Sequence, residues 1–243
     1  MPVQAEWVTT STPDGDMRVY LARPEGTGPW PGLIVIQEIF GVNDHIQDVT
    51  RRFAAEGFVA AAPELYHRFE ESERDIPYSD LQRAFAVRSR LSDDMVMMDV
   101  DATYDLLNRR PDVRSGQIGI VGYCYGGRVA YLAATRNPNL KAVASYYGGR
   151  IVADEPNAPI NFSENIRAPI ILFFGEQDQS ITMEQVRQIE ATLKRLGKQY
   201  ELHTYPQAGH GFFCDHRPAH YNAEAAADAW PKTLQFLKRY LAA

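Results

Sequence analysis

A cysteine stands where a strand-like run of this sequence turns into a helix-like run. The apolar run 118–123 ends in the pattern Gly122-Tyr-Cys124-Tyr-Gly126. This is the G-x-S-x-G nucleophile elbow with sulfur in place of oxygen. The two glycines leave room for a sharp backbone turn at the apex. A thiol there would lie at a helix N-terminus, whose N–H dipoles favour the thiolate that attacks carbonyl carbons.

A cysteine nucleophile needs a base to hold its proton and an acid to orient that base. Where this elbow occurs, the order along the chain is nucleophile, acid, histidine. Asp178 follows the apolar run 170–174, and His210 stands in the glycine-rich loop 208–212. Either residue alone is as well explained as a turn acid or a structural histidine, but their order and positions together favour a catalytic triad. Glu176 is the competing acid. Asp178 is preferred because the chain must leave the sheet edge before an acidic side chain can turn toward His210.

The segments that must position these residues alternate between strand-like and helix-like patterns. The expected strands are 3–10, 17–22, 33–38, 58–62, 117–122, 142–147, 170–174 and 200–205. The expected helices are 44–55, 92–109, 125–136, one opened by a capping box at Thr182 and Gln185, and 222–241. This alternation predicts an α/β protein with a mostly parallel central sheet flanked by helices on both faces. Together with the elbow motif, it indicates the α/β-hydrolase fold.

The chain is expected to form one domain over residues 1–243, since this length suffices for a large α/β domain with a substantial core. Residues 66–90 are polar, charged and weakly patterned, so we interpret them as an irregular, lid-like excursion with a short helix. Ligands of such sheets bind beyond the carboxyl ends of the strands. Cys124, Asp178 and His210 all follow predicted strand ends.

Composition restricts the partners and the compartment. A net charge of -6 argues against nucleic acid or an anionic membrane surface as partner. No signal-like stretch opens the sequence, and no apolar run is long enough to cross a bilayer. The two cysteines, Cys124 and Cys214, form no C-x-x-C pair, which favours a reduced, cytoplasmic setting. The histidines near the C-terminus match no zinc motif, so neither a metal nor a cofactor is expected.

Four segments, in this order and spacing, resemble the dienelactone hydrolase family over nearly the whole chain. They are Gln37-Glu38-Ile39-Phe40-Gly41-Val42-Asn43, Gly122-Tyr123-Cys124-Tyr125-Gly126-Gly127, Phe174-Gly175-Glu176-Gln177-Asp178 and Gly209-His210-Gly211-Phe212. The resemblance implies a Cys124–His210–Asp178 triad. It also implies that Glu38 lies beside the cysteine and that its ionisation is coupled to thiolate formation when substrate binds.

A carboxylate at the end of an apolar strand is costly to place without a purpose, which independently favours a functional Glu38. The oxyanion hole is expected to consist of two backbone N–H groups, one after the nucleophile and one after the third strand. These positions correspond to Tyr125 and Ile39.

The expected chemistry is acyl transfer through a thioester. A thiolate leaves more readily than most alkoxides, so its attack on an ordinary alkyl ester tends to reverse. Substrates that release a stabilised enolate avoid this reversal. We therefore expect a carboxymethylenebutenolidase-like hydrolase of carboxylic esters (EC 3.1.1.-). It would act on small-molecule activated esters or enol lactones, as a monomer or homodimer.

The residues that line the substrate pocket are less constrained by the sequence. The family's best-known activity holds a substrate carboxylate with two arginines. The candidates here are Arg217 after the histidine and, before the 92–109 helix, Arg83, with Arg88 and Arg90 as alternatives to it. Arg217 stands further from the histidine than the resemblance implies, so the identity of the substrate stays open. Phe40, Tyr147 and Phe212 indicate an aromatic pocket, although core packing explains each of them equally well.

Three alternatives stand beside this hypothesis. The protein could be a promiscuous hydrolase of other activated esters, whether aryl, thioester or phosphoryl. It could be a non-catalytic binding protein on the same fold, although a binder has no need of three matched groups. A redox-sensing thiol would need a resolving partner, for which Cys214 is the only candidate.

Overall fold

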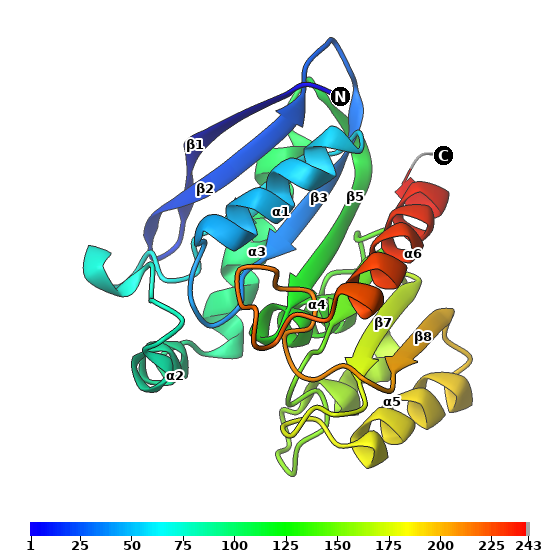
Figure 1. Ribbon diagram of the computed structural model, residues 1–243. Helices are drawn as coiled ribbons and strands as arrows, with labels where there is room; N and C mark the ends of the chain where they lie inside the picture. Colours follow the sequence, from blue (N-terminus) through cyan, green and yellow to red (C-terminus); the bar gives the residue numbers. More distant parts are fainter. Residues whose placement is uncertain (242–243) are drawn as a thin grey trace. The chain divides into compact units, whose positions relative to one another are not determined.

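The computed structural model describes residues 1–241, which form two compact units that meet in sequence between Gly119 and Ile120 (Figure 1). Strand β5 (Val113–Tyr123) runs from the first unit into the second. The eight strands are ordered β1-β2-β4-β3-β5-β6-β7-β8 in one sheet. The expectation of a single domain over residues 1–243 stays a prediction.

The first unit begins with an antiparallel hairpin of β1 (Val3–Thr12) and β2 (Gly15–Pro24). Gly15 closes its turn with a φ of 119°, a value that side chains disfavour. Strand β4 (Val59–Pro63) pairs antiparallel with β2 and parallel with β3 (Trp30–Ile36). The hairpin is therefore the antiparallel edge of a sheet that is otherwise parallel.

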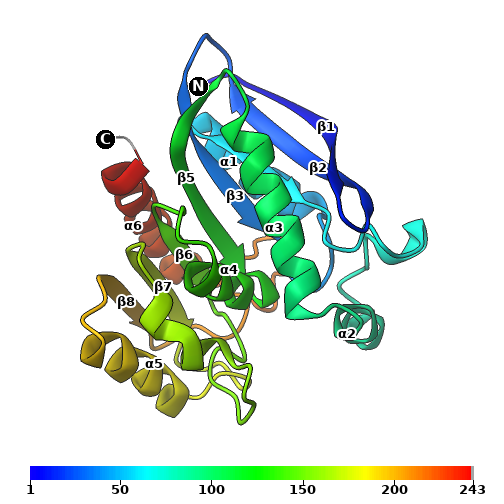
Figure 2. The same cartoon turned by 180° about the vertical axis from the view of Figure 1, so that it is seen from behind.

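Two amphipathic helices cover the sheet of the first unit. Helix α1 (Asp44–Ala55) lies in front of the strands in Figure 1, and α3 (Asp93–Asn108) lies in front of them in Figure 2, seen from behind. Asn43 caps α1 by accepting a hydrogen bond from the Ile46 N–H, and Ser92 caps α3 in the same way. These local signals explain why both helices begin where the sequence predicts.

The excursion 66–90 contains a 3₁₀ turn, η1 (Glu71–Glu73), and a helix, α2 (Leu81–Ser89). It is tied to the segment after β3 within the same unit. An isolated antiparallel bridge joins Gly41 to Asp75, and the Ile76 N–H donates to the Phe40 carbonyl at 2.9 Å. The excursion thus supports the backbone around Phe40, and its use as a lid stays a prediction.

The strands of the second unit all pair parallel to one another. They are the end of β5, β6 (Val143–Tyr146), β7 (Ile170–Gly175) and β8 (Tyr200–Tyr205). Its helices are α4 (Tyr125–Arg136), α5 (Met183–Arg195) and α6 (Ala223–Leu241), with the 3₁₀ helix η2 (Pro159–Asn165). Helix α6 lies in front of the strands in Figure 1 and α4 on their other face in Figure 2. The predicted parallel sheet with helices on both faces is confirmed.

Packed aromatic rings form much of the core of the second unit. The ring of Tyr146 lies 4.8 Å from that of Tyr123 and 4.6 Å from that of Phe173, and all three side chains are fully buried. The Tyr146 hydroxyl meets Thr233 of α6 at 2.6 Å, so the buried polar group is satisfied. The core therefore attaches α6 to the sheet.

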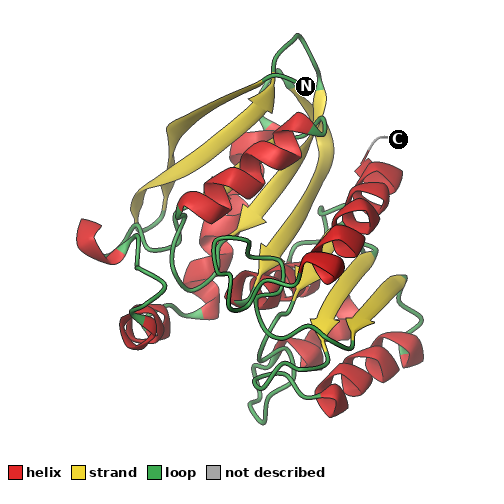
Figure 3. Cartoon of the chain, viewed as in Figure 1, coloured by secondary structure: helices red, strands yellow, loops and turns green. Residues whose placement is uncertain are grey.

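A few boundaries differ from the sequence prediction. Strand β3 covers Trp30–Ile36 rather than 33–38, and β5 begins at Val113 rather than 117. The start of β5 is polar, so its strand character comes from pairing rather than from an apolar pattern. The sequence did not predict η2, which lies in the long connection between β6 and β7 (Figure 3). Among residues 1–241, no helix is both long and apolar enough to span a bilayer.

Candidate active site

Cys124 occupies the apex of a sharp turn between β5 and α4. Its φ of 56° and ψ of -116° lie in a region that non-glycine residues rarely adopt. Gly122 is needed beneath this turn, because a Cβ there would overlap the backbone of Gly126. Gly127 is needed too, because its Cβ would overlap the Tyr146 carbonyl of the neighbouring strand. The backbone thus has the shape that the elbow motif predicts.

The Cys124 side chain is half-buried, and its Sγ lies 3.0 Å from the Nε2 atom of His210. The residue caps α4, whose N–H groups stabilise negative charge at this end of the helix. The sulfur therefore has both a proton acceptor and a favourable field close by.

The loops after β7 and β8 bring the acid and the histidine together. Past the strand ends, the Gln177 N–H donates to the Ala208 carbonyl at 2.9 Å. A Cβ at Gly175 would overlap that same carbonyl, so the close approach requires glycine. At the tips of the two loops, His210 Nδ1 lies 2.7 Å from Asp178 Oδ2. Sulfur, imidazole and carboxylate thus form a continuous chain within the second unit.

The charges in this chain support one another. Burial disfavours a protonated His210, but the negative charge of Cys124 and the hydrogen bond to Asp178 outweigh it and raise the pKa of His210 well above its ordinary value. Burial alone would raise the pKa of Asp178, yet hydrogen bonds from His210 and Ser180 hold that pKa below its ordinary value. The geometry therefore favours a protonated imidazole paired with an ionised Asp178.

Ser180 is a part of this cluster that the sequence analysis missed. Asp178 Oδ1 accepts hydrogen bonds from the Ser180 N–H at 2.8 Å, the Ser180 Oγ at 2.7 Å and the Ile181 N–H at 3.2 Å. The Ser180 Oγ also lies 3.3 Å from His210 Nδ1. The signal that could have found it is the Asp-x-Ser spacing. This spacing is typical of a turn in which an aspartate accepts a hydrogen bond from the backbone N–H two residues on.

The other predicted pocket residues of the second unit lie around His210. Tyr147 has a φ of 36°, and its ring meets the imidazole edge-on with centroids 5.3 Å apart. Phe212 is fully buried and packs edge-on against Tyr147 at 5.2 Å. Arg217 Nη2 lies 2.9 Å from His220 Nε2, and His220 Nδ1 lies 3.2 Å from the His210 carbonyl. Arg217 therefore supports the loop of His210, whereas substrate binding by these residues stays a prediction.

Tyr125, whose N–H is one of the two predicted oxyanion donors, is the first residue of α4. The N–H groups of a first helical turn point out of the helix N-terminus. The direction of this group thus suits the predicted role.

The predicted residues Glu38 and Ile39 follow β3 in the first unit, where Glu38 is fully buried. The Gln37 amide donates to the Glu38 carbonyl at 3.3 Å and accepts from the Leu65 N–H at 3.2 Å. The Tyr66 hydroxyl donates to the Ile39 carbonyl at 2.8 Å. These bonds fix the peptide planes on both sides of Ile39.

Phe40 and Arg83 complete the predicted set, and both belong to the first unit. Phe40 is buried and packs edge-on against Tyr78 at 4.7 Å. The guanidinium of Arg83 donates to the Ser72 carbonyl within the excursion. The structure thus brings together Cys124, Asp178 and His210, and the roles predicted for residues of the first unit stay predictions.

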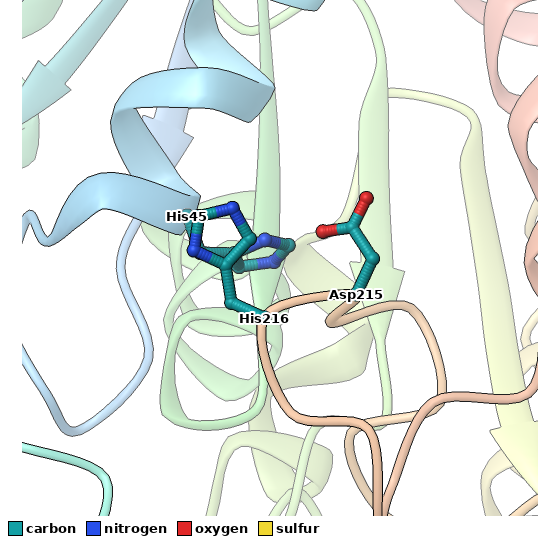
Figure 4. Close-up of side chains that lie close together, drawn as sticks. All are labelled: His45, Asp215 and His216. Carbon is teal, nitrogen blue, oxygen red and sulfur yellow. The ribbon is translucent and has the colours of Figure 1, made fainter.

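The loop of His210 carries further titratable side chains. Asp215 is half-buried and His216 is exposed, and both are drawn in Figure 4 with His45, a buried residue of α1 in the first unit. Cys214, next to them in sequence, is fully buried. A buried thiol is shielded from oxidants, which weakens the redox alternative.

Comparison with known proteins identifies the family. The profile of the dienelactone hydrolase family matches residues 17–241. The chain belongs to the dienelactone hydrolase family. It is 39% identical over 250 residues to a carboxymethylenebutenolidase-like protein of Synechocystis sp., covering 99% of this chain and 100% of that one. A protein of the same description from Escherichia coli K12 is 39% identical over 239 residues, covering 95% and 86% of the two chains.

Solved structures agree with this assignment. The crystal structure of a dienelactone hydrolase-like protein from Klebsiella pneumoniae superimposes with a TM-score of 0.91 at 33% identity. The match covers 99% of this chain and 100% of that one. The predicted family, the α/β-hydrolase type of fold and the hydrolase class, which acts on lactone or ester bonds, are confirmed.

Proposed function

We propose that this member of the dienelactone hydrolase family hydrolyses small activated esters or enol lactones through a thioester on Cys124. One observation carries the proposal: Sγ of Cys124 lies 3.0 Å from Nε2 of His210, whose Nδ1 lies 2.7 Å from Asp178. A thiol, a base and an orienting acid in this order are the parts that nucleophilic acyl transfer needs.

In the first half of the reaction, the Cys124 thiolate attacks the carbonyl carbon and a C–S bond forms. The carbonyl oxygen becomes an oxyanion, held by the backbone N–H groups that we assign to Tyr125 and Ile39. The C–O bond then breaks, and the leaving enolate or alkoxide takes the proton of the His210 imidazolium, which leaves His210 neutral. In a lactone, the leaving oxygen stays attached to the acyl group.

In the second half, neutral His210 takes a proton from water, and the hydroxide formed attacks the thioester carbonyl. The C–S bond breaks, the acid is released, and the thiolate–imidazolium pair is restored. Asp178 holds the imidazole so that Nε2 faces the sulfur and the attacking water. The raised pKa of His210 suits this cycle, because the resting pair needs a protonated imidazole.

Glu38 has a separate role in the proposal. Its ionisation is coupled to formation of the thiolate when substrate binds, as the family resemblance implies. Its full burial supports a functional role, since an acid buried at the end of an apolar strand is costly to keep.

The leaving group decides the substrate class. After a thiolate attacks an enol or aryl ester, the enolate or aryl oxide is expelled easily. After it attacks a simple alkyl ester, the thiolate itself is expelled and the attack reverses. The names of the relatives, which refer to a butenolide, support an unsaturated lactone as the preferred substrate. Aryl, thioester and phosphoryl esters are the wider range of the same site.

Two further expectations accompany the proposal. The enzyme acts in the cytoplasm, and it is a monomer or a homodimer in solution. Light scattering on the purified protein decides the second point.

Hydrolysis of a dienelactone and of p-nitrophenyl acetate tests the proposal. Cys124→Ala should lose at least about 10³-fold in kcat on both substrates. The matched control Cys214→Ala, which removes the other cysteine, should keep kcat within about threefold, because its buried thiol has no role in the proposed chemistry. Mass spectrometry of quenched wild-type enzyme should find an acyl group on Cys124. Full activity of Cys124→Ala would overturn the mechanism.

A further inference from the structure

The carboxylate of Asp178 accepts more hydrogen bonds than the one that orients the histidine. Its side chain is only 1% exposed, and its two oxygens are divided between two tasks. Oδ2 faces His210 Nδ1, whereas Oδ1 accepts the N–H groups of Ser180 and Ile181 and the Ser180 hydroxyl. Rotation of the carboxylate would break all of these bonds together.

The Ser180 hydroxyl touches both partners of the ion pair. Its oxygen lies 2.7 Å from Asp178 Oδ1 and 3.3 Å from His210 Nδ1. A hydroxyl has one proton, and an ionised carboxylate can only accept, so the proton points at Oδ1. The lone pairs of the same oxygen are then left to face the Nδ1–H group. The Nδ1 proton thus has a main acceptor in Asp178 and a second, weaker one in Ser180.

We propose that Ser180 is a positioning residue, whose hydroxyl holds the Asp178 carboxylate in plane with His210 and keeps the imidazole proton on Nδ1. With Nδ1 protonated and the ring held, Nε2 stays directed at the Cys124 sulfur. The inference rests on the proposed function, because it gives Ser180 its importance through the Cys124–His210–Asp178 chain. Ser180 itself does not touch the sulfur.

A purely local role for Ser180 is the competing explanation. The aspartate-to-backbone bonds of this turn use the N–H groups of residues 180 and 181, which remain whatever side chain stands at 180. Helix α5 also begins independently, through the capping box of Thr182 and Gln185. Ser180 is exposed, so its replacement opens no cavity. Substitution at this position therefore isolates the hydroxyl from the shape of the loop.

The test compares Ser180→Ala, Ser180→Thr and Ser180→Val. Threonine and valine have the same shape and differ in the hydroxyl. The titratable groups that face the imidazole within the second unit are Cys124, Asp178 and Tyr147, and all three variants retain them. One readout is steady-state hydrolysis of p-nitrophenyl acetate. The other is the proton NMR resonance of His210 Nδ1–H, assigned by its absence in His210→Gln and followed against pH.

The alanine and valine variants should lose about 5- to 30-fold in kcat with KM within about twofold, since alignment is lost but binding is not. Their Nδ1–H resonance should exchange faster with water, and its pH midpoint should fall by about half a unit to one unit. Ser180→Thr should stay within about threefold of wild type in kcat and keep the midpoint.

Three results would count against the inference. If alanine and valine match wild type in kcat and midpoint, the hydroxyl positions nothing. If threonine fails as far as valine, shape rather than the hydroxyl matters. If Cys124→Ala keeps its activity, the proposed function fails, and the role of Ser180 in catalysis fails with it. The NMR comparison needs no turnover, so it separates the last case from the first two.

Discussion

Gly122 offers the sharpest test of the elbow, because its lack of a side chain lets β5 and α4 meet. An ideal Cβ at this position would lie 1.9 Å from the Gly126 carbonyl oxygen and 2.2 Å from its carbon. Cβ atoms in folded proteins do not approach closer than 3.0 Å, so the backbone would have to separate by roughly 1 Å or more. The obstructing atoms are backbone rather than a flexible side chain, so no rotamer change relieves the overlap.

Gly122→Ala should therefore lower the free energy of unfolding by about 3 kcal/mol or more. In a chain of this size, such a loss lowers Tm by roughly 6–12 °C. Cys124 lies between the two overlapping segments and must move with them. A shift of about 1 Å in a reacting group costs on the order of 10²-fold in rate, so kcat should fall by at least that factor.

The assay is urea denaturation followed by circular dichroism, together with steady-state hydrolysis. Gly149→Ala is the matched control in the same unit, since its nearest neighbour to a new Cβ is an Ile181 side-chain carbon at 3.9 Å. The control should change stability by less than about 1 kcal/mol. Equal stability of the two variants would refute the close approach of β5 and α4, and with it the reason given for the strained cysteine.

Three further predictions concern the charges and the first unit. Asp178→Asn should lower kcat by about 10³- to 10⁴-fold, measured by steady-state hydrolysis, because the imidazole loses its anionic partner; a loss under tenfold would contradict this. The raised pKa of His210 stabilises the fold below the ordinary value of 6.5, and this contribution is lost as pH rises through the raised pKa. Urea titrations of wild type and His210→Gln should therefore differ most at pH 6 and converge above the raised pKa, and a constant gap would refute the linkage. Gly41→Ala should cost about 3 kcal/mol by urea denaturation, since φ is +95° and a Cβ would overlap the Arg74 carbonyl. Gly197→Ala, with φ of +63° and open space, should cost only about 1–2 kcal/mol, and an equal cost for both would argue against the overlap.

Elements with local causes were predictable from the sequence. Helix α1 covers the predicted range 44–55, because Asn43 caps it and an apolar stripe faces the sheet. The capping box of Thr182 and Gln185 forms as expected at the start of α5. Strand β8 matches its predicted range, Tyr200–Tyr205. In each case, the residues that determine the element lie within or beside it.

Elements that depend on distant partners were predicted less well. The first residues of β5 are polar, and their strand form comes from pairing. The left-handed backbone of Tyr147, whose ring lies beside His210, has no signature in the sequence. Ser180 was missed because its approach to His210 joins loops 30 residues apart, although its bond to Asp178 is local.

By itself, the sequence determined the alternation of strands and helices, the glycines of the elbow, and the order of cysteine, acid and histidine. Short-range sterics and hydrogen bonds produce these features, so nearby residues encode them. Only the tertiary structure decided that Cys124 Sγ, His210 and Asp178 lie at 3.0 and 2.7 Å, and which oxygen of the carboxylate meets the histidine. Those distances depend on how closely β5, β7 and β8 pack and how their loops cross, and such long-range packing has no periodicity along the chain.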